Sequence, residues 1–189
     1  MTTAAIHRDH AIFRVILEAT SHPGNGFALP DSGTCIDRQA TLINMLGSLM
    51  DNEVTFSIIG DVGDSIADAI AFRTGSFLVG ISEADFVIAS RGATDGLLAL
   101  IKRGTLEYPD KGATVVYLID EIADKGGNAA LTGPGIDGII QPLFSGLADS
   151  ELSGLCKVNS EYPLGVDAMF LDAHGRIACI PRSTRIGIS

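Results

Sequence analysis

The sequence predicts a single α/β domain, a layered sandwich in which helices flank a mixed β-sheet. Helix-like and strand-like segments alternate along the chain, and two apolar segments near the C-terminus have the pattern of a hairpin. No internal repeat and no Pro- or Ser-rich linker divides the 189 residues. We therefore expect one domain over residues 1–189.

The N-terminal part is expected to form two helices. Residues 9–21 place apolar side chains on one helical face, and Pro23-Gly24 ends that helix. Residues 37–50 carry leucine and methionine at helical spacing, and Asp37 can cap the first turn. Both patterns indicate helices that face a core.

The middle of the chain alternates between strand and helix patterns. Residues 54–58 alternate apolar and polar as in a half-buried strand, and residues 61–70 have a helical pattern. Residues 85–89 form a short apolar run typical of a strand. Thr94 is expected to cap a helix that ends at Gly104.

The C-terminal part is expected to complete the sheet. Residues 114–119 are rich in β-branched side chains and predict a central strand, and residues 145–157 predict a helix. Residues 166–171 and 177–180 flank the turn-like sequence Asp172-Ala173-His174-Gly175 and predict an antiparallel hairpin. The sheet is therefore expected to be mixed.

The composition restricts the classes of partner. A net charge of −10 argues against binding to nucleic acid or to an anionic membrane surface. Charged residues make up only 19% of the chain, against a typical share of about 25%. So low a share of charged residues predicts an apolar surface that contacts other chains. We therefore expect a homodimer or a larger assembly.

The compartment is expected to be the cytoplasm. No apolar run has the length of a membrane span, and the first residues lack the apolar block of a signal peptide. Cys35, Cys156 and Cys179 are widely spaced and odd in number, which is typical of reduced thiols that pack in the interior.

Two segments are candidates for anion binding. The turn-like sequence LTGPGI, residues 131–136, could bring backbone amides near an oxyanion, although Pro134 removes one donor. The sequence PRSTR, residues 181–185, is the better candidate. In an extended conformation, Arg182 and Thr184 would meet one phosphate while Arg185 points elsewhere. The competing interpretation is a solvated or partner-contacting strand.

Other kinds of site have little support in the sequence. His7 and His10 lack companions for a metal site, and no nucleophile elbow is present. The four lysines, Lys102, Lys111, Lys125 and Lys157, lie in polar surroundings that do not indicate a pyridoxal phosphate pocket. We expect neither a metal nor pyridoxal phosphate.

Several motifs together resemble the PhnH family of the carbon–phosphorus lyase system. They are FRVILEATSHPG at residues 13–24, YPDKGATVVYLI at 108–119, LTGPGI at 131–136, YPLGVD at 162–167 and IPRSTR at 180–185. Their order and spacing cover nearly the whole chain. The chain departs from the family's pattern at the last motif, where Ser183 replaces a threonine and Arg185 stands at a histidine-like position.

The resemblance implies a fold like the large domain of pyridoxal phosphate transferases, without the cofactor lysine. It also implies a role in organic phosphonate catabolism with subunits G, I, J and L. With its G and I partners and an ATP-binding-cassette-like L partner, the family transfers ribose triphosphate from ATP to an alkylphosphonate and releases adenine. Another protein of the system cleaves the carbon–phosphorus bond. The resemblance assigns no catalytic residue to this chain, so whether it is itself an enzyme stays open.

Two hypotheses for the molecular role follow. The first is a supporting subunit that docks onto the lyase complex through apolar surface. The second is a subunit that binds ATP or the phosphonate through Arg14, Arg182 and Thr184. On the second hypothesis, Arg182→Ala lowers affinity and leaves folding little affected. Asp167, which follows the turn-like residues 162–165, is expected to have a structural role.

Overall fold

The structure of the protein is a computed structural model that describes residues 3–30, 37–61, 64–127 and 129–188. Within these residues it forms four α-helices: α1 (Thr3–Ser21), α2 (Arg38–Gly47), α3 (Asp64–Thr74) and α4 (Asp149–Val158). Two short 3-10 helices, η1 (Leu97–Leu100) and η2 (Pro109–Lys111), lie between α3 and α4.

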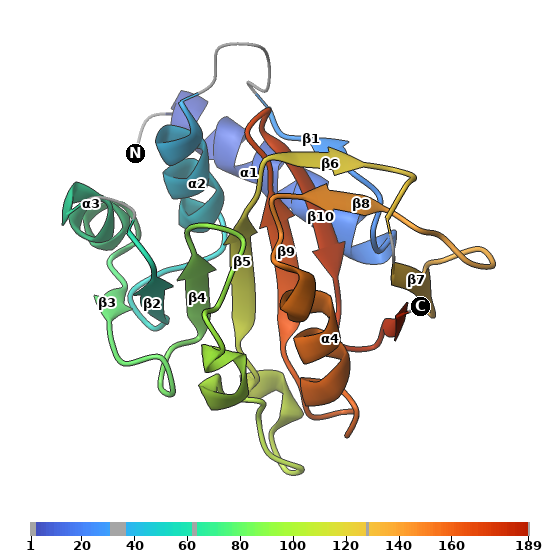
Figure 1. The fold of residues 1–189 in the computed structure, drawn as a ribbon. Helices are drawn as coiled ribbons and strands as arrows, with labels where there is room; N and C mark the ends of the chain where they lie inside the picture. The colour runs from blue at the N-terminus through green and yellow to red at the C-terminus, as the bar shows by residue number, and fades with distance from the viewer. Residues whose placement is uncertain (1–2, 31–36, 62–63, 128, 189) are drawn as a thin grey trace.

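A seven-stranded sheet forms the centre of the molecule (Figure 1). Its strands, in spatial order, are β1 (Phe27–Ala28), β10 (Arg176–Ile180), β9 (Asp167–Leu171), β5 (Thr114–Leu118), β4 (Phe86–Ala89), β2 (Thr55–Ile59) and β3 (Phe77–Leu78). The strands from β3 to β9 are parallel, whereas β10 pairs antiparallel with both of its neighbours, β9 and β1. The predicted single α/β domain with a mixed sheet is therefore confirmed, with β5 at its middle.

Two small antiparallel sheets accompany the large one. They pair β11 (Arg185–Ile188) with β7 (Ala129–Thr132) and β6 (Glu121–Ala123) with β8 (Leu143–Ser145). Of these strands, only β11 has a counterpart in the sequence analysis, in the competing interpretation of residues 181–185 as a strand. The segments of β6, β7 and β8 are short and show no clear alternation of apolar and polar residues.

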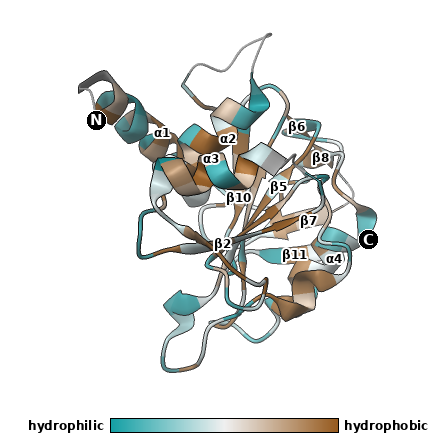
Figure 2. Ribbon diagram, turned by 90° about the vertical axis from the view of Figure 1, so that its left-hand side faces the viewer, coloured by the Kyte–Doolittle hydropathy of each residue, from teal (hydrophilic) through white to brown (hydrophobic). Residues whose placement is uncertain are grey.

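Helices and small sheets cover the two faces of the large sheet, and its strands are predominantly hydrophobic (Figure 2). On one face, α1, α2 and α3 contribute Ile16, Leu42 and Ile70 to a core with the sheet. On the other face, Leu155 and Val158 of α4 pack with η1 and the small sheets. Both faces of the sheet are thus buried, as parallel sheets require.

The boundaries correct several local predictions. Residues 54–58 were predicted to form a half-buried strand. Alternate side chains of this segment do pack against the helices, but Ile59 packs into the core on the opposite face of the sheet, so β2 is buried on both faces. Thr94 does not cap an α-helix, because η1 is a 3-10 helix after Gly96 and the Thr94 hydroxyl bonds Glu151 instead. Asp37 does cap α2, with its carboxylate accepting from Gln39 N and Ala40 N.

The cysteines differ in their environments. Cys179 is buried on β10, and desolvation raises the pKa of its thiol to about 12. Cys156 on α4 is exposed, so the prediction that it packs in the interior is wrong. Cys35 lies outside the described residues.

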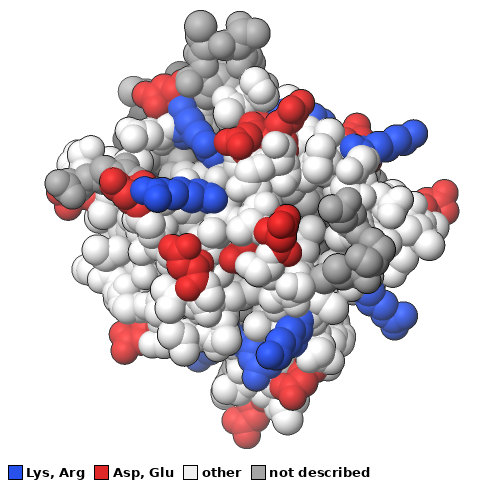
Figure 3. All heavy atoms as spheres, in the orientation of Figure 1, with Lys and Arg blue, Asp and Glu red and all other residues white. Residues whose placement is uncertain are grey.

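Much of the surface is uncharged. On the face shown in Figure 3, acidic and basic side chains are scattered and separated by broad uncharged areas. Ile6, Phe13 and Leu17 of α1 are 54%, 40% and 52% exposed. A second exposed set lies where α3 leads into the edge strand β3: Phe72, Phe77 and Leu78. None of the helices in the described part of the chain combines the length and apolarity needed to cross a membrane.

Candidate functional site

The two candidate anion-binding segments lie side by side in the structure. Strand β11 pairs antiparallel with β7, so that Arg185 is opposite Thr132. A pocket of about 840 Å³ opens beside this pair and reaches the C-terminal end of α4. We call it the C-terminal pocket, and its lining residues are Thr132, Gly133, Pro134, Cys156, Asn159, Ser160, Tyr162, Arg182, Ser183, Thr184, Arg185 and Ile186.

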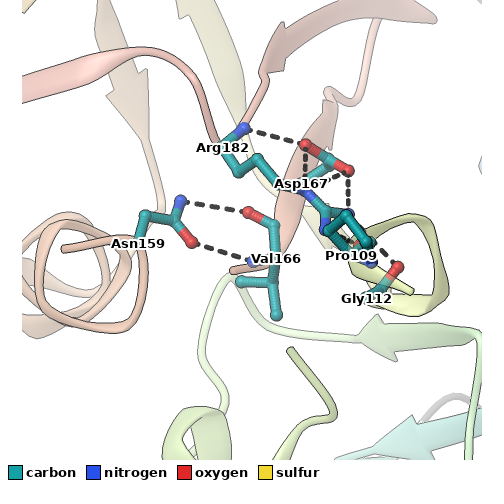
Figure 4. Close-up of polar contacts among 6 residues, drawn as sticks. All are labelled: Pro109, Gly112, Asn159, Val166, Asp167 and Arg182. Carbon is teal, nitrogen blue, oxygen red and sulfur yellow. Dashed lines mark hydrogen bonds and ion pairs between the residues drawn. The ribbon is translucent and has the colours of Figure 1, made fainter. Parts of the chain in front are cut away.

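Arg182 is held by protein groups on several sides. Its Nε and Nη2 donate to the carboxylate of Asp167, and Nη1 and Nη2 also donate to the backbone oxygens of Pro109 and Gly112 (Figure 4). The side chain is only 13% exposed. Because each nitrogen of the guanidinium already donates to a protein acceptor, Arg182 joins β9 to the turn of η2 and offers little to a ligand.

Asp167 has the structural role that the sequence predicted. Besides the guanidinium, its Oδ1 accepts a hydrogen bond of 2.8 Å from the backbone N–H of Arg182. The neighbouring backbone is held by Asn159, whose side chain accepts from Val166 N and donates to Val166 O (Figure 4). These contacts fix the C-terminal segment against the end of α4.

Thr184 lines the pocket, but its hydroxyl is enclosed. The backbone N–H of Thr184 donates to Pro181 O at 2.9 Å, so residues 181–184 form a turn and not the predicted extended segment. The residue is 4% exposed, and its Oγ1 has no hydrogen-bond partner among the described residues. Such an unsatisfied buried hydroxyl is uncommon in proteins.

Arg185 is the arginine that the sequence interpretation did not expect to contact a phosphate. It lines the same pocket as Thr184, so the prediction that it points elsewhere is wrong. Its side chain is exposed and makes no hydrogen bond or ion pair with any other described residue. The lining of the pocket contains no Asp or Glu. In a chain of net charge −10, this pocket is therefore locally favourable for an anion.

Arg14 belongs to a different part of the molecule. It is an exposed residue of α1, which packs on the face of the sheet opposite to α4. The structure thus brings Arg182 and Thr184 together but leaves Arg14 away from them.

A buried carboxylate forms a second polar centre that the sequence did not indicate. Glu151 of α4 is 3% exposed and accepts hydrogen bonds from Thr94 N, Thr94 Oγ1 and the Tyr117 hydroxyl, each 2.8–2.9 Å long. Burial, together with the Glu151 charge, raises the pKa of Tyr117 far above its ordinary value. The Tyr117 ring stacks on Phe170 at 5.3 Å between centroids. The Tyr117 hydroxyl therefore remains a donor at neutral pH.

The chemistry available for a metal or a ligand is limited. Among residues with described positions, no group of three or more His, Cys, Asp or Glu side chains could hold a metal ion. The C-terminal pocket offers the exposed guanidinium of Arg185, several hydroxyls and an apolar wall. These groups suit the binding of an anion by charge and hydrogen bonds.

Comparison with known proteins identifies relatives of the chain. The family described as bacterial phosphonate metabolism protein (PhnH) matches residues 2–187. A protein of Stutzerimonas stutzeri named putative C-P lyase subunit protein HtxG is 29% identical over 96% of this chain and 87% of its own length. A protein of Rhizobium meliloti strain 1021, named alpha-D-ribose 1-methylphosphonate 5-triphosphate synthase subunit PhnH, is 31% identical over 62% of this chain and 58% of its own length.

Proposed function

Because the chain belongs to the bacterial phosphonate metabolism protein (PhnH) family, we propose that it is a subunit of a carbon–phosphorus lyase system. Its role is to support and dock with subunits G, I, J and L in the cytoplasm. With G, I and L, the chain takes part in the transfer of ribose triphosphate from ATP to an alkylphosphonate, which releases adenine. The names of the two relatives, a lyase subunit and a ribose 1-methylphosphonate 5-triphosphate synthase subunit, support this assignment.

The exposed apolar stripe of α1 is the observation that favours docking. Ile6, Phe13 and Leu17 are spaced by seven and four residues, which places them on one side of the helix. The side with Ile12 and Ile16 is already buried in the core. An α-helix with two apolar sides, one of them open, is typical of a subunit that contacts another chain.

A homodimer in isolation is part of the same proposal. The second exposed apolar set, Phe72, Phe77 and Leu78, lies at the β3 edge of the sheet. Phe72 alone is 94% exposed. With two such sets, the chain has apolar surface for both a second copy of itself and partner subunits.

We expect Leu17→Glu to weaken assembly without unfolding the chain. Leu17 is 52% exposed, so the fold loses little, whereas a charge buried against a partner is costly. Co-expression of the tagged chain with subunits G, I, J and L should recover roughly tenfold less partner than the wild type does. His7→Glu is the matched control, since His7 is exposed on the same helix away from the stripe.

Equal recovery of the partners by Leu17→Glu and His7→Glu would show that the α1 stripe does not dock. Sedimentation of both variants reports on the homodimer in the same preparations. A wild-type chain that sediments only as a 19.7 kDa species would contradict the dimer.

Direct ligand binding in the C-terminal pocket is the second candidate function. The pocket has the exposed Arg185, the enclosed Thr184 hydroxyl and no acidic lining residue. These features suit a phosphonate or the phosphates of ATP. Arg182 would contribute by shaping the pocket, since its donors are engaged with Asp167 and two carbonyl oxygens. The likeness to pyridoxal phosphate transferases stays a prediction from the family resemblance. The expectation of neither pyridoxal phosphate nor a metal likewise stays a prediction.

A further inference from the structure

A second hollow lies at the carboxyl ends of the parallel strands. Its volume is about 460 Å³ and it shares no residue with the C-terminal pocket. Ser90 directly follows β4, Leu118 ends β5, and Asp61 follows β2. The other lining residues come from the start of α2 and from helix faces: Arg38, Gln39, Leu42 and Ile66.

The topology of the sheet makes this position a favoured one for ligands. From β2 the chain runs through α3 to β3 on one side, and it then returns to β4 on the other side of β2. α3 packs on one face of the sheet, and η1, which leads from β4 toward β5, packs on the opposite face. The connections thus diverge between β2 and β4, and open α/β sheets bind ligands in the crevice at such a switch point.

Two of the residues that line this hollow each have a buried polar side-chain atom without a hydrogen-bond partner. These atoms are Arg38 Nε and Ser90 Oγ, and Thr184 Oγ1 is the third such atom in the described part of the chain. Arg38 is otherwise well anchored, since its Nη2 donates to the backbone oxygens of Ile119 at 2.7 Å and Leu171 at 3.3 Å. An anchored guanidinium with one N–H unpaired, and an unpaired hydroxyl on another residue that lines the same hollow, indicate a site for an acceptor.

The charges around the hollow decide the kind of acceptor. Asp120 and Asp172 already act on the Arg38 guanidinium from outside the lining, and Asp61 is a carboxylate of the lining itself. An anionic ligand would be repelled by this surplus of negative charge. Apart from Gln39, the remaining wall is apolar, from Leu42, Ile66 and Leu118. A neutral molecule with oxygen atoms on one side and an apolar face on the other fits both features.

We propose that this hollow binds a neutral, hydroxyl-bearing small molecule of the size of a monosaccharide or a nucleoside. Its oxygen atoms accept a hydrogen bond from Arg38 Nε and pair with the hydroxyl of Ser90. Its less polar face packs on the side chains of α2, α3 and β5. The hollow shares no residue with the C-terminal pocket, and its occupation requires no partner subunit.

The test uses D-ribose and adenosine as probes, with ribose 5-phosphate as the anionic counterpart. Melting temperature and calorimetry are measured on the full chain at millimolar probe. Wild-type protein should be stabilised by a neutral probe and less by the phosphate. Ser90→Ala should raise the melting temperature of the free protein, because an unpaired buried hydroxyl is removed, and should lower probe affinity roughly tenfold.

Thr184→Val is the matched control, since it removes the other unpartnered buried hydroxyl and leaves the hollow intact. It should raise the melting temperature and keep full affinity for the neutral probes. Arg38→Lys, which keeps the charge and removes Nε, should lower probe affinity as Ser90→Ala does. Ribose 5-phosphate is compared with ribose on Arg185→Ala protein, in which the C-terminal pocket has lost its exposed cation. The proposal is overturned if neither neutral probe binds, if Ser90→Ala binds as well as the wild type, or if ribose 5-phosphate binds Arg185→Ala protein more tightly than ribose does.

Discussion

Replacing Glu151 with leucine is expected to lower the free energy of unfolding by about 3–5 kcal/mol. The carboxylate is 3% exposed and accepts from Thr94 N, Thr94 Oγ1 and the Tyr117 hydroxyl. Leucine would leave these donors buried without an acceptor. The variant no longer has to bury a charged carboxylate, but this gain offsets only part of the lost hydrogen bonding. Urea denaturation followed by circular dichroism measures the effect.

Two further variants make the prediction specific. Tyr117→Phe removes one donor and keeps the ring that stacks on Phe170, so it should cost about 1–2 kcal/mol. Asp149→Ala, in the same turn of α4 but exposed, should cost about 0.3–1 kcal/mol through the helix dipole. A Glu151→Leu protein as stable as Asp149→Ala would show that the buried network contributes nothing.

Replacing Arg182 with alanine is expected to destabilise the fold by about 2–3 kcal/mol. The geometry thus reverses the expectation from sequence that folding would be little affected. The variant leaves the oxygens of Pro109 and Gly112 without their donor and the Asp167 carboxylate without its cation. The estimate stays below the value for a fully buried pair because Asp167 is 34% exposed and can be rehydrated.

Arg185→Ala is the matched control for Arg182→Ala. The Arg185 side chain is exposed and has no hydrogen-bond or ion-pair partner among the described residues, so its removal should change stability by less than about 0.5 kcal/mol. If the C-terminal pocket binds ATP or a phosphonate, Arg185→Ala should lower that affinity roughly tenfold, which calorimetry detects. Arg185→Ala protein that melts as low as Arg182→Ala protein would contradict the assignment of separate roles.

The periodic elements of the fold could be predicted because their signal is local. The helical spacing of α1 and the β-branched run of β5 are visible within a short window. The edge strands β1 and β3 have two residues each, and so short a segment carries no period. η1 was mistaken for an α-helix because leucines at 97 and 98 suit either helical geometry. Thr94 was mistaken for its cap because the sequence does not show that the Thr94 hydroxyl donates to Glu151 of α4.

The sequence could name candidate residues for a site, but it could not show which groups each of them contacts. Arg182 and Thr184 do line one pocket, and the LTGPGI turn lies beside them because β7 pairs with β11. Arg182 is unavailable to a ligand because it donates to Asp167 and to Pro109 O, which belong to other parts of the chain. The sequence near the two arginines does not show this difference between them. Glu151 and Tyr117 are likewise joined only by tertiary folding, so nothing near either residue in the sequence signals the pair.

Growth on a phosphonate tests the proposed function most directly. The measurement is complementation of a bacterial strain that lacks its own member of the PhnH family, with methylphosphonate as the sole phosphorus source. Wild-type chain should restore growth, and Leu17→Glu should fail to do so while His7→Glu succeeds. All strains should grow on inorganic phosphate. Failure of the wild-type chain to restore growth, or full restoration by Leu17→Glu, would contradict a protein that acts by docking through α1.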